Sequence, residues 1–447
     1  MRDNSNNKGI NDEPPALVVY FTNVILLLGS SFCLFILILS IYRIIFPLGG
    51  RLFFLVLATL GLVGIVLFLL ALKLKMNLRA NISLLTFSVL ISLYFFEVVY
   101  EIIIRPKSTI EIITDYKRSG LNVYPNILPS SFINESFETD NTSIWPLGGG
   151  LSNVVYLMRD NFSFKTYLSD EYGFNNPKGL YNENNVDIVL LGDSFVEGYC
   201  VKNTQNISAH LRKRGFNVLN LGKGGNGPFC QYISLVEYAK PVSPNIVFWF
   251  YFEENDLKDL IGKENSQIFS LYINSIGYSQ DLISKQDRIN DFLQIWIDDR
   301  LQSKISENKK KVLLMKNLKL FNLRNLLNVR AKPVKQRIPE ETFHIFRNIL
   351  DRSDKVVSNW GGELYFVYLP CWNRYYYNDS ELYNRDNVLQ IVSDLNIPVI
   401  DIHEVFIRAT DVYEYFPNRL SSHYNAYGYQ VVGEAISDYL SKVIIIQ

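Results

Sequence analysis

The stretch VDIVLLGDSFVEG, residues Val186–Gly198, decides the fold of the C-terminal half of this chain. It begins with a run of β-branched and aliphatic residues, which is typical of a buried strand in a parallel sheet. The run leads into Gly192-Asp193-Ser194, where the glycine permits a sharp turn and leaves Ser194 at the carboxyl end of the strand. In open α/β sheets the chemistry lies at that end. By itself such a tripeptide is more often an ordinary turn or helix N-cap than a catalytic site. The downstream sequence is therefore needed to choose between these two interpretations.

Strand-like and helix-like segments alternate from Val186 onward. Asn245–Phe252 is a continuous apolar run, as expected for a strand covered on both faces. The other predicted strands are Val186–Leu191, Phe216–Leu221, Glu363–Leu369 and Ile397–Ile402, and the predicted helices are Thr204–Arg214, Pro228–Ala239 and Tyr424–Lys442. This alternation predicts a flavodoxin-like, three-layer α/β/α fold around a mostly parallel five-stranded sheet.

Length and composition place further bounds on the protein. The chain has 447 residues, which is too long for one ordinary domain. Lysine plus arginine and aspartate plus glutamate number 44 each, so the charge balance points to no nucleic acid or other polyanionic partner. Hydrophobic residues make up 48% of the chain and are concentrated in its first quarter.

That first quarter predicts three transmembrane helices after an N-terminal tail of residues 1–15. Ala16–Tyr42 and Leu52–Leu72 are apolar and long enough to cross a bilayer, and Asn81–Ile104 is interrupted only by Glu97 and Glu101. The first segment is too long for a cleaved signal peptide. A lipid bilayer is therefore a predicted partner, and the two glutamates, which share a helix face, are expected near its outer surface.

The distribution of basic residues predicts the orientation of these helices. Five lysines and arginines fall on the proposed inner side of the first helices: Arg2, Lys8, Lys73, Lys75 and Arg79. Positive charge is retained on the cytoplasmic side, so the N-terminus is expected inside. Three crossings then place everything after Ile104 outside the cytoplasm.

The remainder divides into two predicted regions. Residues 105–185 are expected to form a linker and a small β-rich addition, in which Asn153–Leu168 supplies short strands. Residues 186–447 form the α/β domain, with a helical insertion at about 260–359 between its third and fourth strands.

Two parts of the insertion have distinct patterns. Its first half, Ile268–Leu301, has helical spacing. Lys304–Arg337 contains eleven lysines and arginines against one acid, Glu307, and reads as a basic amphipathic helix. Such a helix either packs on its own domain, which we favour, or lies on an anionic membrane surface.

Three further segments carry candidate chemistry. The loop NLGKGGNGP, Asn220–Pro228, follows the second strand and aims backbone amides into space, as a donor to an oxyanion does. Asn255 follows the third strand and offers a neutral donor without a competing charge. His423 stands just before the last helix in a chain with four histidines.

These blocks, in this order, resemble the SGNH/GDSL hydrolase family. The resemblance rests on Gly192-Asp193-Ser194, Gly225, Asn255-Asp256 and His423, and spans about Asp187–Leu440 without the insertion. It implies that Ser194 is the nucleophile and His423 the general base. It also implies an oxyanion hole made by the Ser194 and Gly225 amides and the Asn255 side chain.

The sequence departs from the family pattern in two places. The acid that usually stands two or three residues before the histidine is replaced by Ser421 and Leu420. The group that orients His423 is therefore open, and a backbone carbonyl is one alternative to the acids nearby. The candidate orienting acids are Asp411, Glu414 and Asp401.

The second departure concerns Glu253 and Glu254, which precede Asn255 where the family often carries glycine. The second acid is expected either to narrow the site or to meet a cationic group of the substrate.

The four cysteines complete the list of reactive side chains. Cys200 and Cys230 both follow loops at the same predicted sheet edge, so a disulfide and two free thiols are both compatible with the sequence. No spacing typical of a metal site occurs, and no cofactor is expected.

The predicted function is that of a membrane-anchored serine esterase or O-acyltransferase. Its substrate would carry ester groups, on a cell-surface polysaccharide or on a lipid. One alternative is a catalytically inactive glycan-binding or assembly protein of the same fold, which the missing acid favours. Another is a lipase at the membrane surface, which the basic insertion favours. The oligomeric state is left open.

Overall fold

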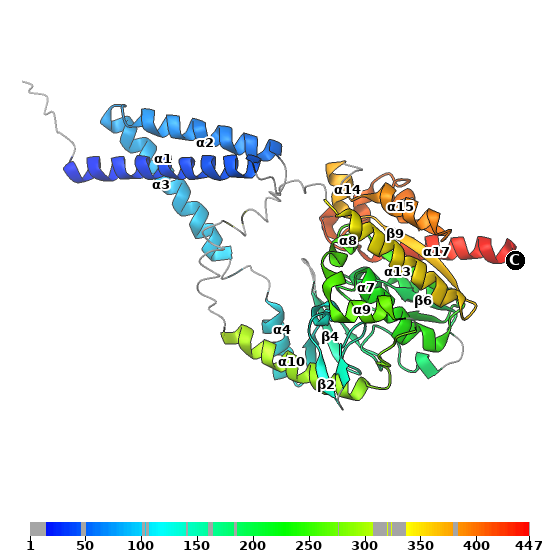
Figure 1. The fold of residues 1–447 in the computed structure, drawn as a ribbon. Helices are drawn as coiled ribbons and strands as arrows, with labels where there is room; N and C mark the ends of the chain where they lie inside the picture. The colour runs from blue at the N-terminus through cyan, green and yellow to red at the C-terminus, as the bar shows by residue number, and fades with distance from the viewer. Residues whose placement is uncertain are drawn as a thin grey trace, which may run out of the picture. The chain divides into compact units, whose positions relative to one another are not determined.

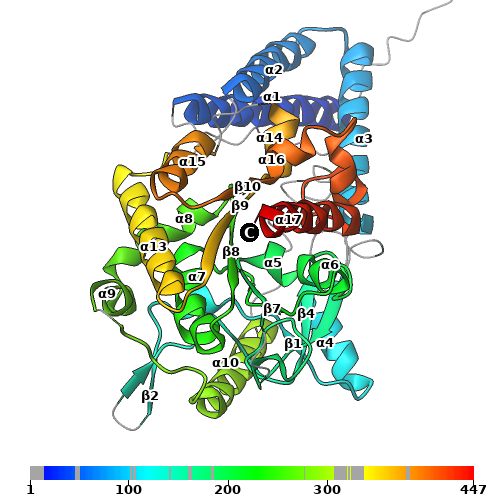
Figure 2. The same cartoon turned by 90° about the vertical axis from the view of Figure 1, so that its right-hand side faces the viewer.

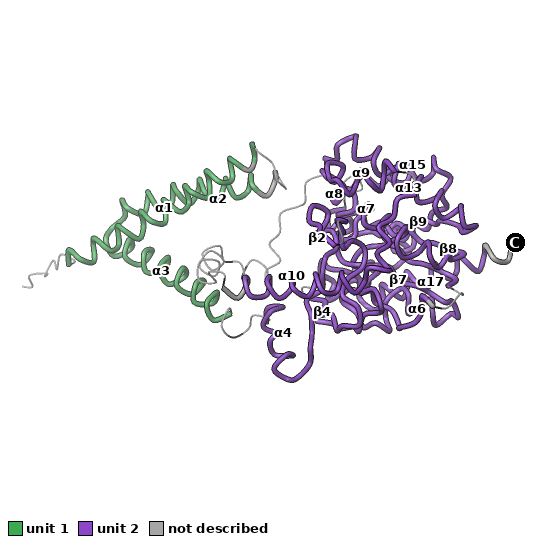
Figure 3. The backbone as a smooth tube through the Cα atoms, turned by 60° about the horizontal axis from the view of Figure 1, so that its bottom comes forward, with its two compact units in different colours: residues 1–106, 307–334 green, residues 107–306, 335–447 purple. Residues whose placement is uncertain are grey.

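The computed structural model describes residues 15–45, 51–100, 103, 107–139, 142–159, 164–182, 186–275, 277–306, 320, 323, 337–378 and 383–446. The chain divides into two compact units, coloured separately in Figure 3. The first comprises residues 1–106 and 307–334, and the second comprises residues 107–306 and 335–447.

Figure 1 shows the fold and labels many of its helices and strands. The helices are α1 (Ala16–Ile45), α2 (Arg51–Ala71), α3 (Met76–Val99), α4 (Thr109–Arg118), α5 (Ser194–Glu197), α6 (Ile207–Lys213), α7 (Pro228–Ser234), α8 (Asp256–Leu260), α9 (Gln267–Asn274), α10 (Gln286–Ser306), α13 (Glu340–Ser358), α14 (Trp372–Tyr377), α15 (Arg385–Asp394), α16 (Ile402–Phe406) and α17 (Ala426–Ile446). The strands are β1 (Val123–Pro125), β2 (Phe137–Thr139), β3 (Thr142–Ile144), β4 (Val155–Arg159), β5 (Phe164–Leu168), β6 (Ile188–Leu191), β7 (Val218–Asn220), β8 (Ile246–Phe252), β9 (Glu363–Leu369) and β10 (Val399–Asp401).

The first unit contains three helices long and apolar enough to span a membrane, α1, α2 and α3, as the sequence predicts. Small residues let α1 and α2 approach closely. A Cβ added at Gly64 would lie 2.5 Å from Cys33 Sγ, and one at Gly29 would lie 2.7 Å from the ring of Phe68. Such close backbone approach is how helices associate where no hydrophobic driving force acts between them. The third helix begins at Met76, five residues before the predicted start.

The second unit is built on a five-stranded, wholly parallel sheet of order β10-β9-β8-β6-β7. Numbered along the chain, this is the order 2-1-3-4-5 of flavodoxin-like folds. The predicted fold class is confirmed, and all five predicted strands are present. Strand order reverses between β6 and β8, so the two loops that leave these strands diverge and open a crevice at the carboxyl edge.

Each face of this sheet carries its own hydrophobic core. On β8, Val247, Trp249 and Tyr251 point to one core, and Phe248 and Phe250 point to the other. The first face is covered by α7 and α13, and the second by α6 and α17, which flank the strands in Figure 2. Burial on both faces explains why these strands read as continuous apolar runs rather than as alternating ones.

Local capping corrects the predicted ends of two helices. The helix predicted at Thr204–Arg214 begins only at Ile207, because the Asn206 side chain accepts a hydrogen bond from the Ala209 amide at 2.9 Å. The last helix begins at Ala426 rather than Tyr424 and continues to Ile446. Asn425 caps it by accepting from the Tyr427 and Gly428 amides.

Residues 107–182 contain the expected short strands and one helix that the sequence analysis missed. β4 pairs with β1 in parallel and with β5 in antiparallel orientation, and β2 and β3 form a separate hairpin. The missed helix is α4, which begins with a capping box between Ser108 and Glu111. Its short length and mixed polarity hide it among turn-forming residues.

The insertion differs from its prediction. Ile268–Leu301 is not one helical stretch: α9 ends at Asn274 and α10 begins at Gln286. The basic helix predicted at Lys304–Arg337 lies outside the described residues except at Lys304–Ser306, Leu320, Leu323 and Arg337. The long helix α13, which packs on the sheet, was not predicted.

Candidate active site

Ser194 is the first residue of a short helix at the carboxyl end of β6. The turn before it is tight: a Cβ on Gly192 would lie 2.3 Å from Val196 Cγ2. Asp193 is the N-cap of α5, and its Oδ1 accepts a hydrogen bond from the Phe195 amide at 2.9 Å. The N-cap expected for Gly192-Asp193-Ser194 is therefore present, and it holds Ser194 at the carboxyl edge of the sheet.

The structure brings His423 to Ser194, although 228 residues separate them in the sequence. The distance from Ser194 Oγ to His423 Nε2 is 2.7 Å, which is a hydrogen bond. The imidazole packs on the ring of Phe195, with centroids 4.7 Å apart, and stacks on Tyr199 at 5.0 Å. The following residue, Tyr424, is buried and donates to the carbonyl of Pro370, which anchors the loop that carries the histidine.

The glycine loop after β7 lies beside α5. Gly225 has φ +77°, a conformation that favours glycine, and a Cβ there would lie 3.0 Å from Ser130 Oγ. The neighbouring Gly224 amide donates to Glu197 Oε2 at 2.7 Å. The loop is thus bound to the helix that begins with Ser194.

Asn255 follows the end of β8, as predicted, but a charged side chain, Asp259, lies next to its amide. Its Nδ2 donates to Asp259 Oδ2 at 2.9 Å, because the two residues stand four apart at the start of α8. Its Oδ1 is buried without a hydrogen-bond partner among the described residues. The expectation of a donor free of competing charge is therefore wrong, and an oxyanion has to compete with a carboxylate for this amide.

Two more carboxyl groups are buried around Asn255. Burial raises the pKa of Asp193 to about 7, and the negative charge of Asp259 adds to the shift. Burial also holds the pKa of Asp256 well above its usual range, and the negative charges of Asp193 and Asp259 raise it further. Desolvation disfavours the ionised form, so these groups retain protons to unusually high pH.

Two of the three predicted orienting acids, Asp411 and Asp401, pair with arginines through their carboxylates. Asp411 forms an ion pair with Arg419 and accepts from the Tyr413 amide. Asp401 forms an ion pair with Arg385. For Glu414, the backbone carbonyl accepts a hydrogen bond from Asn425 at 2.7 Å.

Glu253, one of the two acids that replace glycine, is neutralised within the protein. It is buried, and its Oε1 and Oε2 accept from Arg374 Nε at 3.0 and 2.8 Å. The Cys371 amide donates to it at 2.7 Å. Glu254 accepts from Asn373 Nδ2 at 3.1 Å. Sequence analysis missed Arg374, because nothing in the sequence around this single arginine indicates that it pairs with Glu253 at the end of β8.

The cysteines and the metal prediction can be compared with the described residues. All four cysteines are among the described residues and none forms a disulfide, so Cys200 and Cys230 are not joined in this structure. The Cys200 Sγ lies 3.5 Å from Ser422 Oγ, next to His423. Within the described ranges, no group of three histidine, cysteine, aspartate or glutamate side chains is arranged to hold a metal ion.

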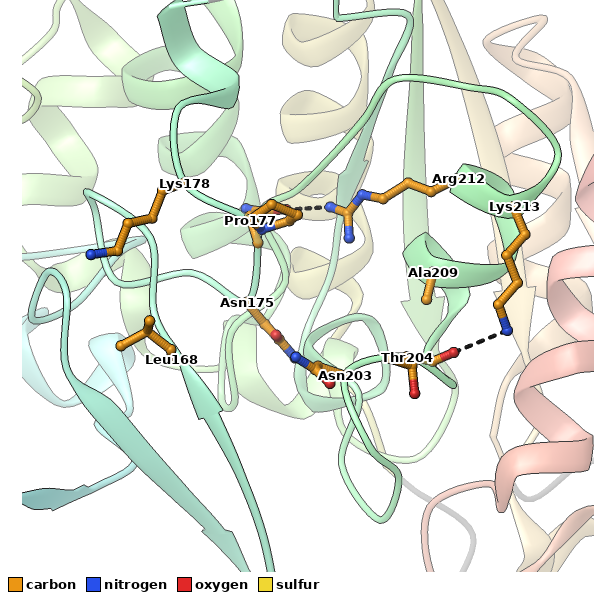
Figure 4. Close-up of a pocket in the computed structure, with 10 residues that line it drawn as sticks. Leu168, Asn175, Pro177, Lys178, Asn203, Thr204, Ala209, Arg212 and Lys213 are labelled. Carbon is orange, nitrogen blue, oxygen red and sulfur yellow. Dashed lines mark hydrogen bonds between the residues drawn. The ribbon is translucent and has the colours of Figure 1, made fainter. Parts of the chain in front are cut away.

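A pocket of about 450 Å³ is lined by none of the predicted site residues (Figure 4). Its polar wall includes Arg212, which donates to Asn176 Oδ1 at 2.6 Å, and Lys213, which donates to the carbonyl of Thr204. A second, much smaller pocket of about 40 Å³ is lined by Gly225, Asp259 and neighbouring residues. Because Arg212 and Lys213 are hydrogen-bonded within the protein and no predicted site residue lines the larger pocket, we assign it no role in the chemistry.

Comparison with known proteins locates similar folds among solved structures only. No family model and no curated protein matches the chain. A lipase/acylhydrolase from Enterococcus faecalis is similar at 14% identity and a TM-score of 0.32, over 57% of this chain and 94% of that one. A protein described as lipolytic and of the G-D-S-L family, from Desulfitobacterium hafniense, is similar at 15% identity and a TM-score of 0.32, over 57% and 99%. A protein described as an acylhydrolase, from Bacteroides fragilis, is similar at 13% identity and a TM-score of 0.30, over 58% and 88%.

The class of the second unit is defined by its own strand order and site. It is a flavodoxin-like α/β/α unit with a serine–histidine pair at the carboxyl edge of a parallel sheet. The serine follows β6 and Asn255 follows β8, which are the two strands that flank the reversal of strand order. That position is where ligands bind in open α/β sheets.

Proposed function

We propose that this protein is a membrane-anchored serine esterase or O-acyltransferase that acts on ester groups. The observation that carries the proposal is the hydrogen bond of 2.7 Å between Ser194 Oγ and His423 Nε2. A serine hydroxyl is a weak nucleophile until an adjacent base takes its proton, and an imidazole at this distance can do so. The three apolar helices support attachment to a lipid bilayer.

The proposed reaction has two steps. Ser194 Oγ attacks the ester carbonyl while His423 Nε2 takes the hydroxyl proton, and the same imidazole then gives that proton to the departing alcohol. In the second step water or an acceptor hydroxyl attacks the acyl carbonyl while His423 Nε2 takes its proton. The bond from Ser194 Oγ to the acyl group then breaks, and the imidazole returns that proton to Ser194 Oγ. The Ser194 and Gly225 amides and the Asn255 side chain are the proposed donors to the oxyanion, a role in which one donor typically contributes ~10²–10³ in rate.

The substrate class and the alternatives are part of the same proposal. The ester is carried by a polysaccharide or a lipid outside the cytoplasm, where the predicted orientation puts Ser194. A non-catalytic glycan-binding protein is the alternative, supported by the engagement of Asn255 with Asp259. A membrane-surface lipase is a narrower form of the esterase proposal.

Labelling with a serine-reactive fluorophosphonate tests the proposal. The full chain in detergent is treated with the probe, beside a Ser194→Ala variant and a His423→Ala variant. We expect the wild type to be labelled at Ser194, the first variant not to be labelled, and the second to be labelled much more slowly. No labelling of the wild type, together with no hydrolysis of p-nitrophenyl acetate, would favour the binding protein.

A further inference from the structure

A buried carboxylate at the other end of the serine helix accepts hydrogen bonds from three parts of the chain. Glu197 Oε2 accepts from the Gly224 amide at 2.7 Å and from Asn126 Nδ2 at 2.9 Å. Its Oε1 accepts from the Tyr167 hydroxyl at 2.6 Å and lies 3.2 Å from Lys223 Nζ. The donors come from the β-rich addition and from the glycine loop, so Glu197 joins both to the helix of the nucleophile.

The ammonium group that meets Glu197 is as deeply buried as the carboxylate. Lys223 Nζ also donates to the Tyr167 hydroxyl at 2.8 Å and to the Gly173 carbonyl at 3.0 Å, and it lies 3.9 Å from the centroid of the Tyr156 ring. All three of its N–H bonds thus have acceptors. A fully hydrogen-bonded buried pair of this kind gives its surroundings one well-defined geometry, whereas removing one member leaves the other charge uncompensated.

This network binds the residue next to Gly225, whose amide is one of the proposed oxyanion donors. The amide of Gly224 is held by Glu197, and the next amide in the chain is that of Gly225. Gly225 has φ +77°, a conformation that favours glycine, and the direction of its N–H follows from the conformation of the loop that Glu197 holds. An oxyanion donor stabilises the transition state only when it already points at the developing charge.

The same carboxylate also reaches the proposed base. Asn126 donates from one Nδ2 atom to Glu197 and to the Tyr199 hydroxyl, the latter at 2.8 Å. The Tyr199 ring stacks on the imidazole of His423 at an interplanar angle of 28°. From a fully buried position, Glu197 is therefore linked both to the loop of the proposed oxyanion donor and, through Asn126 and Tyr199, to the imidazole.

We infer that Glu197 is a positioning residue, which holds the Gly225 amide and the His423 imidazole in the geometry that the reaction at Ser194 requires. The inference rests on the proposed function. It also assigns a role to the β-rich addition: Asn126 and Tyr167 complete the active site of the α/β core from outside it.

The test compares two buried carboxylates in the same unit. Glu197→Gln keeps the size of the side chain but turns one acceptor into a donor, which opposes the N–H and ammonium donors around it. Glu237→Gln is the matched control, because Glu237 is also a buried carboxylate. It accepts hydrogen bonds from Tyr272, Gln280 and Leu282, and none of these three is a predicted site residue. Both variants are made in the full chain, and p-nitrophenyl acetate hydrolysis and unfolding temperature are measured.

Both substitutions are expected to lower the unfolding temperature, but only one is expected to lower turnover. For Glu197→Gln we expect kcat to fall by roughly 10²-fold at nearly unchanged KM, as for a misplaced oxyanion donor. For Glu237→Gln we expect kcat to stay within about twofold, because its neighbours play no part in the transition state. Fluorophosphonate labelling of Ser194 should slow in parallel with kcat.

A milder variant covers the case in which Glu197→Gln does not fold. Asn126→Ala removes one donor to Glu197 and one to Tyr199 while leaving the buried ion pair intact, and we expect kcat to fall by about tenfold. A wild type that is labelled at Ser194, with either folded variant as active as the control, overturns the inference alone. A wild type with neither labelling nor hydrolysis overturns the proposed function, and the inference with it.

Discussion

Asp193 has two properties that oppose each other: its carboxyl group caps a helix, and it is buried among other acidic side chains. Its carboxylate caps the helix that begins with Ser194, and the same carboxylate is buried beside Asp259 and Asp256. A hydrogen bond from Asn255 lowers its pKa, but the opposing effect of burial is larger and raises it to about 7. Capping needs only an acceptor oxygen, which the protonated acid also provides.

The titration of Asp193 predicts a pH dependence of stability. Its pKa of about 7 in the folded protein lies above the ordinary value of 3.8. The folded state therefore holds its proton more tightly, and this contribution is complete below pH 3.8 and lost as the pH rises through about 7. Relative to a variant that does not titrate, the wild type should lose up to about 4 kcal/mol of unfolding free energy across this window.

Asp193→Asn is that variant, because asparagine caps a helix and stays neutral. Urea unfolding of both proteins at several values between about pH 4 and about pH 8 measures the difference. The wild type should become progressively less stable than the variant as the pH rises. A difference that is independent of pH would contradict the raised pKa of Asp193.

The partners of the candidate acids predict how His423 responds to their removal. Asp411 and Asp401 are each engaged with an arginine, so Asp411→Asn and Asp401→Asn should lower kcat by less than about tenfold. Disabling the acid of a complete triad costs ~10⁴. Hydrolysis of p-nitrophenyl acetate measures both, with Ser194→Ala as the inactive reference. A loss near the larger value for either variant would identify that residue as the orienting acid.

At the scale of elements, the site is assembled from loops that leave neighbouring strands. Ser194 follows β6, the glycine loop follows β7 and Asn255 follows β8, so parallel pairing places all three at one edge of the sheet. His423 comes from the loop before α17, a helix that covers the second face of the same sheet. The rigid sheet therefore sets the spacing, and the loops need only hold their own local geometry.

The glycine loop offers a test at this scale. Gly225→Ala places a Cβ on a residue with φ +77° and 3.0 Å from Ser130 Oγ, so the backbone is strained and we expect the loop to shift. We expect kcat for p-nitrophenyl acetate to fall by roughly 10–10²-fold, because the proposed donor amide moves with the loop. The control is Gly215→Ala, where φ is +95° and the added Cβ meets no atom within 4 Å. Equal losses of kcat in the two variants would indicate general strain rather than a displaced donor.

At the scale of the whole molecule, the chain combines a unit of apolar helices with an α/β/α unit. The helices of the first unit expose large apolar side chains along their length, whereas the second unit buries its aliphatic and aromatic residues on both faces of the sheet. Surfaces so different need different surroundings, lipid for the first and water for the second.

The orientation in the membrane remains a prediction that a reporter fusion tests. Because five basic residues lie on the proposed inner side, the C-terminus is expected outside the cytoplasm. A reporter that is active only outside the cytoplasm, fused after Gln447, should be active. A fusion to a reporter that works only in the cytoplasm serves as the control, and activity of that fusion instead would reverse the orientation.

Local sequence determined the elements of this protein whose signals are continuous. Apolar runs identified the three long helices and all five sheet strands, because burial in lipid or between two helical layers demands uninterrupted hydrophobic residues. The order of the motifs also placed Ser194 and Asn255 at the ends of their strands. Helix α4 escaped because its signal is short and mixed, and helix ends shifted by a few residues where Asn206 and Asn425 supply caps.

The family resemblance had paired Ser194 with His423, and the folded chain brings them to 2.7 Å. Only the tertiary structure decided the other contacts of the site, such as the competition of Asp259 for Asn255 and the burial of Glu197 against Lys223. No local pattern encodes such pairs, because their energy depends on burial and on the orientation of both partners. Sequence therefore determined where polar groups stand along the chain, and packing determined which of them are neutralised and which stay available for chemistry.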